Sequence, residues 1–136
     1  MKSVSIPGRG TLQIRYVVVD LNGTLTESGV FIPGVLDALA SLHKQGLSVY
    51  VLSADTRGNL EADLSGLPGV GVRVTETAQA KGDVVESLGP EFTICIGNGN
   101  IDIEMFKVAK LSICTIQGEG ATTGALVHAD IVVTRI

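Results

Sequence analysis

An uninterrupted apolar run that ends on a carboxylate constrains this chain more than any other feature. Residues 16–19 read Tyr-Val-Val-Val, and Asp20 follows them directly. Apolar residues without polar alternation are typical of a strand buried on both faces, as in the middle of a parallel sheet. Ligands of such sheets bind beyond the carboxyl ends of the strands. Asp20 is therefore predicted to face a ligand, and an ordinary turn or capping role is the alternative.

Strand and helix patterns alternate along the rest of the chain. Apolar runs predict further strands at residues 47–52, 70–74, 92–96, 111–116 and 130–133. Helical spacing predicts helices at residues 33–44, 58–64, 78–88, 101–108 and just before 128. Residues 3–14 are expected to form a hairpin or edge extension. This order indicates an α/β fold, a three-layer αβα sandwich with a mostly parallel central sheet in a single domain.

Bulk properties narrow the class of protein. The chain has 136 residues and a formal net charge of −4, which gives no reason to expect binding to nucleic acid or to an anionic membrane. No apolar run approaches the roughly 20 residues of a membrane span, so we expect a cytoplasmic protein. Cys95 and Cys114 each lie in an apolar run, and buried thiols are favoured over a disulfide.

Three short motifs carry a resemblance to a known family. They are Asp-Leu-Asn-Gly-Thr-Leu-Thr at residues 20–26, Lys-Gly-Asp-Val-Val-Glu-Ser-Leu at 81–88 and Gly-Asn-Gly-Asn-Ile-Asp at 97–102. In this order they resemble the haloacid dehalogenase-like superfamily, and most closely the phosphorylation domain of P-type ATPases in a soluble form. The likeness covers residues 15–136. The short connection between Asp20 and Ser53 resembles that of members without a cap domain.

The resemblance implies roles for particular residues. Asp20 corresponds to the nucleophile that forms an aspartyl-phosphate, and the catalytic set it implies is Asp20, Asn22, Ser53 and Lys81. Phosphate binding is implied for Ser53, Ala54, Lys81 and Gly23. Binding of Mg²⁺ is implied for Asp20, Asn22 through its main-chain carbonyl, Asn98 and Asp102.

Two positions depart from the family pattern. Most phosphatases of the superfamily have a second Asp where this chain has Asn22, and a carboxamide cannot exchange a proton at neutral pH. Asn98 replaces a carboxylate that is expected to touch the metal ion. An amide oxygen can bind Mg²⁺ but is neutral. We therefore expect slow turnover and weaker metal binding.

Two classes of function remain open. The first is a Mg²⁺-dependent phosphohydrolase that acts on a small phosphorylated substrate, with a homo-oligomer as the expected assembly. The second is a catalytically impaired regulatory domain that binds phosphate or a protein partner, or a stable phospho-acceptor.

The candidate residues also have plainer interpretations. Ser53 could simply enter a helix, Lys81 could be a solvated lysine, and Asp102 could cap a helix. Asn98 and Asn100 could be turn residues. Asp55 and Arg57 could reach a substrate or lie on the surface.

Overall fold

The computed structural model describes residues 1–54 and 60–136. Its centre is a six-stranded sheet in the order β10-β9-β8-β3-β6-β7, and all neighbouring strands are parallel. The strands are β3 (Tyr16–Asp20), β6 (Ser48–Ser53), β7 (Val70–Val74), β8 (Thr93–Gly97), β9 (Leu111–Thr115) and β10 (Ile131–Val133). The predicted α/β fold with a parallel central sheet is confirmed, and the apolar run before Asp20 is indeed a central strand.

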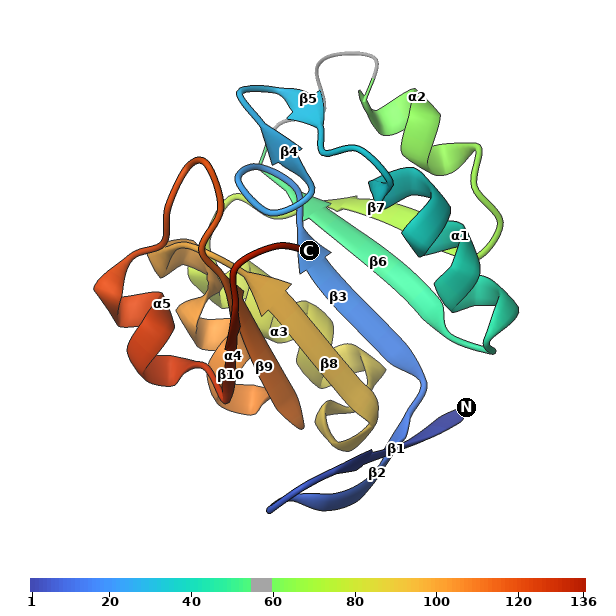
Figure 1. The fold of residues 1–136 in the computed structure, drawn as a ribbon, viewed down its shortest axis with the longest axis vertical. Coiled ribbons are helices and arrows are strands. Elements are labelled where there is room, and N and C mark those ends of the chain that lie inside the picture. The colour runs from blue at the N-terminus through green and yellow to red at the C-terminus, as the bar shows by residue number, and fades with distance from the viewer. Residues whose placement is uncertain (55–59) are drawn as a thin grey trace.

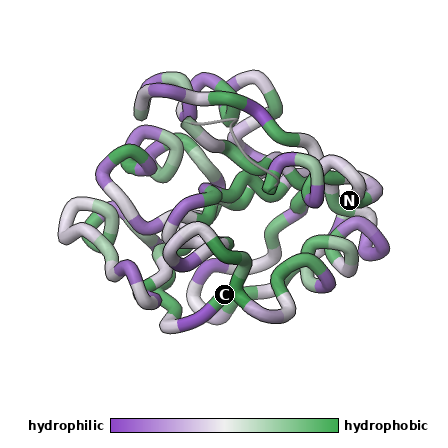
Figure 2. Tube along the Cα trace, turned by 90° about the horizontal axis from the view of Figure 1, so that it is seen from above, coloured by the Kyte–Doolittle hydropathy of each residue, from purple (hydrophilic) through white to green (hydrophobic). Residues whose placement is uncertain are grey.

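Helices cover both faces of this sheet, with α3 and α4 behind it in the view of Figure 1. On one face, α1 (Val35–Lys44) and α2 (Leu60–Ser65) pack against β3, β6 and β7. On the other face lie α3 (Ala78–Leu88), α4 (Ile103–Val108) and α5 (Thr123–His128). Figure 2 shows hydrophobic segments running through the middle of the molecule, where the strands lie. The three layers therefore enclose two apolar cores, one on each side of the sheet.

Two small hairpins stand at opposite ends of the central sheet (Figure 1). The N-terminal hairpin pairs β1 (Lys2–Ile6) with β2 (Gly10–Ile14) and forms a separate two-stranded sheet. The other hairpin pairs β4 (Thr26–Glu27) with β5 (Val30–Phe31), beyond the carboxyl end of β3. This second hairpin, which we call the flap (residues 26–31), is the whole of the regular structure between β3 and α1.

Most predicted boundaries agree with the structure to within two residues, and one disagreement has a clear cause. The helix predicted from Pro33 begins at Val35, because Gly34 has a left-handed backbone (φ 87°) that no α-helix can include. Short 3₁₀ turns at Pro90–Phe92 and Asn100–Asp102 precede β8 and α4. The predicted start of the second helix, at residues 58 and 59, lies outside the described residues.

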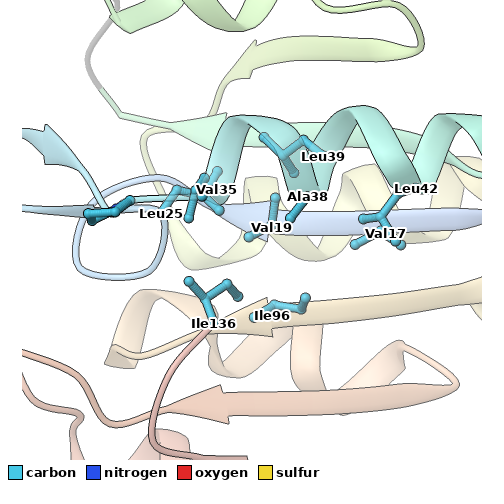
Figure 3. Close-up of a pocket in the computed structure, with 11 residues that line it drawn as sticks. Val17, Val19, Leu25, Val35, Ala38, Leu39, Leu42, Ile96 and Ile136 are labelled. Atoms are coloured by element: carbon cyan, nitrogen blue, oxygen red, sulfur yellow. The ribbon is translucent and has the colours of Figure 1, made fainter.

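An apolar pocket of about 260 Å³ lies between α1 and the sheet (Figure 3). Val19 and Ile96 form part of its floor, Ala38 and Leu39 of α1 its wall, and Ile136 closes one side. The helix therefore leaves part of this sheet face covered only by the end of the chain.

The structure also bears on the expected state of the cysteines and on membrane-spanning helices. Both cysteines are buried and free, since the register places Cys95 opposite Ser112 and Cys114 opposite Gly97. Among the described residues, no helix is long and apolar enough to cross a membrane. The cytoplasmic location stays a prediction.

Candidate active site

A buried lysine joins two carboxylates at the carboxyl end of β3. The Nζ of Lys81 donates to Oδ1 of Asp20 at 2.6 Å and to Oδ1 of Asp102 at 2.8 Å. Lys81 is 1% exposed, so it is not the solvated lysine of the plainer interpretation. The three residues come from β3, from the first turn of α3 and from the 3₁₀ turn before α4. Three motifs that are far apart in the sequence therefore meet at one point.

The charges of this cluster do not cancel. Two carboxylates face one ammonium group, which leaves a formal charge of −1. Burial and the negative charge of Asp102 raise the pKa of Asp20 to about 6, although Lys81 acts in the opposite direction. Burial alone would lower the pKa of Lys81, but the two carboxylates outweigh it and the pKa is raised. Lys81 therefore stays charged, and the carboxylate of Asp20 takes a proton on acidification.

Asp102 has protein donors at both of its carboxylate oxygens. Oδ1 accepts from Lys81, and Oδ2 accepts from the main-chain N–H groups of Asn98 (2.9 Å) and Gly99 (3.0 Å). The side chain is fully buried. Asp102 thus fixes both the lysine and the loop after β8, and the metal-ligand role that the resemblance implies for it stays a prediction.

Asn98 belongs to this loop and faces the turn that follows Asp20. Its Nδ2 donates to the carbonyl of Gly120 at 3.2 Å, and its Oδ1 accepts a long hydrogen bond of 3.4 Å from the hydroxyl of Thr24. A Cβ on Gly23 would lie 2.4 Å from Nδ2, so only glycine fits against the amide there. The polar atoms of Asn98 therefore contact protein groups.

The other candidates lie around this cluster. Ser53 is buried and stands on β6, one residue beyond the residue that pairs with Asp20. Ala54 follows it and is exposed, and Asn22 is exposed in the turn after β3. These placements agree with a rim around Asp20, and the roles implied for the three residues stay predictions. Asp55 and Arg57 lie outside the described residues.

Two residues at this edge were not singled out by sequence analysis. Gln117 donates from Nε2 to the carbonyl of Thr24 at 2.9 Å. Thr75 follows β7, is buried, and has no hydrogen-bond partner for its hydroxyl among the described residues. Only the position of Thr75, at the carboxyl end of a strand as Asp20 is, could have indicated it. Nothing local in the sequence marks Gln117.

The residues present fit one kind of magnesium site. In residues 1–54 and 60–136, no three His, Cys, Asp or Glu side chains are grouped so that they could hold a metal ion. The carboxylates here are those of Asp20 and Asp102, both of which accept from Lys81, and the other nearby donors are neutral oxygens. Mg²⁺ is often bound through one or two carboxylates together with the phosphate of a substrate. The donor set therefore fits an ion shared with a phosphate group, rather than one held by the protein alone.

Comparison with known proteins gives one relative by sequence. No family model matches the chain. A protein of Methanocaldococcus jannaschii named a soluble P-type ATPase-like phosphatase is 26% identical over 117 residues, which are 83% of this chain and 43% of that protein. The chain thus spans less than half the length of this curated relative.

Solved structures share the fold. A Streptomyces avermitilis protein described as a HAD family hydrolase, where HAD stands for haloacid dehalogenase, has a TM-score of 0.73 and 23% identity. The match covers 90% of this chain and 82% of that one. The 3-deoxy-D-manno-octulosonate 8-phosphate phosphatase of Moraxella catarrhalis, solved with magnesium, phosphate and KDO, has a TM-score of 0.74 and 14% identity, covering 89% and 76%. The fold that the motifs predict is confirmed.

Proposed function

We propose, on the premise that this chain has the fold of the haloacid dehalogenase-like superfamily, that it is a magnesium-dependent phosphohydrolase with Asp20 as its nucleophile. The observation that carries the proposal is the buried ammonium group of Lys81, 2.6 Å from Asp20 and 2.8 Å from Asp102. Burial of a lysine and two carboxylates carries a large desolvation cost, so a functional purpose explains this cluster better than stabilisation of the fold does. Neutralising a phosphoryl group beside a nucleophilic carboxylate is such a purpose.

The chemistry proceeds in two displacements. A carboxylate oxygen of Asp20 attacks phosphorus, the bond from phosphorus to the leaving oxygen breaks, and that oxygen takes a proton from solvent. Water then attacks the aspartyl-phosphate and gives a proton to solvent, the phosphorus–Asp20 oxygen bond breaks, and phosphate leaves. Lys81 balances charge throughout, and Asp102 orients Lys81. The contacts of these three side chains support these roles.

Magnesium belongs to this proposal as an ion shared with the substrate. The carboxylate of Asp20 and the main-chain carbonyl of Asn22 are its proposed protein ligands, and when bound it would neutralise charge on the phosphoryl oxygens. Asp102 and Asn98, which the resemblance also implies, stay candidate ligands, since their oxygens accept hydrogen bonds from protein groups as Asp20 does.

The short flap bears on access to the site. Residues 21–34 hold only the β4–β5 hairpin between β3 and α1, so we propose a capless, open site. We propose small phosphorylated molecules as its substrates, a class supported by the name of the solved 3-deoxy-D-manno-octulosonate 8-phosphate phosphatase.

The first experiment measures hydrolysis of an aryl phosphate with Mg²⁺ and with a chelator. Wild type should turn over only with Mg²⁺, and Asp20→Asn should be inactive. Asp63→Asn, on the exposed side of α2, is the matched control and should retain activity. Melting curves establish that each variant is folded. Turnover that survives in Asp20→Asn would contradict the proposal.

A second candidate function, a stable phospho-acceptor, is favoured by Asn22. This exposed residue has no proton to give to a leaving group or to take from water. Intact mass after incubation with a small phosphodonor separates the two functions. A phosphorylated form that persists for hours, without turnover, supports the acceptor. Asn22→Asp should then speed its breakdown by roughly 10-fold or more, since general acid–base catalysis contributes about 10²–10⁴-fold.

A further inference from the structure

A loop from the far end of the chain packs against the turn that follows Asp20. We call residues 117–122 the rim loop and residues 21–26 the Asp20 turn. Gly120 closes the rim loop by donating its N–H to the carbonyl of Gln117 at 2.8 Å. Gln117 in turn donates to the carbonyl of Thr24 and accepts at Oε1 from the N–H of Ile136, both at 2.9 Å. The amide of Gln117 is therefore fixed at both ends.

Asn98 makes the second connection between the same two segments. Its Nδ2 reaches Gly120 of the rim loop and its Oδ1 reaches Thr24 of the Asp20 turn. Its main-chain carbonyl accepts from the N–H of Thr122 at 2.9 Å. Gly23 packs directly on the amide, with no room for a Cβ. Asn98 thus touches the Asp20 turn on one side and the rim loop on the other.

The flap is attached to the same loop. The N–H of Ser28 donates to Oε2 of Glu119 at 3.0 Å, and Gly118 lies against the carboxylate of Glu27, where a Cβ would overlap it. Ser28 has a positive φ of 51°, which is uncommon for a residue other than glycine. The rim loop therefore contacts both the Asp20 turn and the hairpin that follows it.

We propose that Asn98 and Gln117 are positioning residues that hold the Asp20 turn against the rim loop, so that the turn keeps one conformation before any metal ion or phosphate binds. Both act through the amide N–H, which a carboxylate lacks. In Asn98→Asp an oxygen would face the carbonyl of Gly120, and in Gln117→Glu an oxygen would face that of Thr24. Each substitution replaces a hydrogen bond by repulsion between two acceptors.

Amide hydrogen exchange tests these positioning roles without requiring that the protein be an active enzyme. In metal-free buffer, amides of residues 20–28 should exchange about 10-fold faster in both variants than in wild type, the size expected for one lost hydrogen bond. Amides of α3 should be unchanged, which shows that the fold is intact. Asn100→Asp and Gln13→Glu are matched controls and should resemble wild type, since both residues are exposed and Gln13 accepts a hydrogen bond from Ser3 through its amide oxygen. Unchanged exchange at residues 20–28 in both variants would overturn the proposal.

Kinetics add a second readout that rests on the proposed function. A displaced Asp20 turn should lower kcat by roughly 10- to 100-fold in each variant, because small misplacements of reacting groups are costly. The KM should change less. If wild type is inactive and both variants still lose protection, the proposed function fails and the positioning roles stand. If wild type is active and the variants match it in both kcat and exchange, the positioning roles fail alone.

Discussion

At the scale of single residues, Lys81 holds the site together because its ammonium group separates two carboxylates that are nearly or fully buried. Removing one partner from a buried ion pair typically costs about 3–5 kcal/mol. Lys81→Met should therefore lower the free energy of unfolding by about that much at neutral pH, as measured by urea denaturation. Lys107→Met removes only an exposed pair with Glu104 and should cost less than about 1 kcal/mol. Equal losses in the two variants would contradict this role of Lys81.

Asp20 makes stability depend on pH in a specific direction. Its pKa of about 6 in the folded protein lies above the ordinary value of 3.8, so the folded protein binds this proton more tightly than the unfolded chain does. The contribution of Asp20 to stability is complete below about pH 4. It is lost as the pH rises to about 6, by roughly 3 kcal/mol. Asp20→Asn should therefore gain stability relative to wild type across this window.

The measurement is urea unfolding of both proteins between about pH 4 and pH 7, in chelator and without phosphate. The difference between the two proteins isolates Asp20, because all other titrating groups are shared. A difference that stays constant over this range would show that Asp20 titrates at its ordinary pKa when folded.

Sequence motifs predicted which residues gather at the site but not how they are used. The position of Asp20 after an apolar run, and the family resemblance of the motifs that contain Lys81 and Asp102, predicted the cluster. The hydrogen bonds that Oδ2 of Asp102 accepts could not be predicted, because their donors are main-chain N–H groups of a loop. Gln117 was missed for a similar reason. Its hydrogen bond joins residues 93 positions apart, and no local pattern indicates such a contact.

At the scale of elements, α1 covers its sheet face incompletely. The pocket of about 260 Å³ between α1 and the sheet is bordered by Ala38, which points from the helix toward Val19 (Figure 3). Ala38→Leu should fill part of it and raise the free energy of unfolding by about 0.5–2 kcal/mol, the usual gain from filling a cavity. The same substitution at Ala62 of α2, which is exposed as Ala38 is but does not line this pocket, is the matched control and should change stability by less than about 0.5 kcal/mol. Equal effects, measured by urea denaturation, would mean that the pocket does not admit the larger side chain.

Element boundaries show which local signals are strong. Residues 78–88 were predicted as a helix and form α3 with these bounds, because Gly89 and Pro90 end it. The start of α1 was misplaced because Pro33 is a common first residue of helices, whereas the left-handed Gly34 excludes it here. β7 lies at an edge of the sheet, and the guanidinium of its Arg73 lies 4.6 Å from the ring centroid of Tyr50.

At the scale of the whole molecule, the charge of the site couples its two proposed ligands. Asp20, Lys81 and Asp102 together carry a formal charge of −1, which repels a phosphate dianion and attracts a divalent cation only weakly while Lys81 occupies both carboxylates. A bound Mg²⁺ would reverse the sign of the site, and a phosphate would add oxygen ligands for the ion. Each ligand should therefore bind more tightly in the presence of the other.

Thermal melting of the whole protein reports this coupling. Mg²⁺ alone or phosphate alone, at millimolar concentration, should shift Tm by less than about 1 °C. Together, at about ten times the apparent Kd, they should stabilise by about 1.4 kcal/mol, or about 4 °C for a chain of this size. Sodium sulfate at the same ionic strength controls for general salt effects. A full shift with Mg²⁺ alone would show that the protein holds the ion without phosphate, as a site with Asn98 or Asp102 among its direct ligands would.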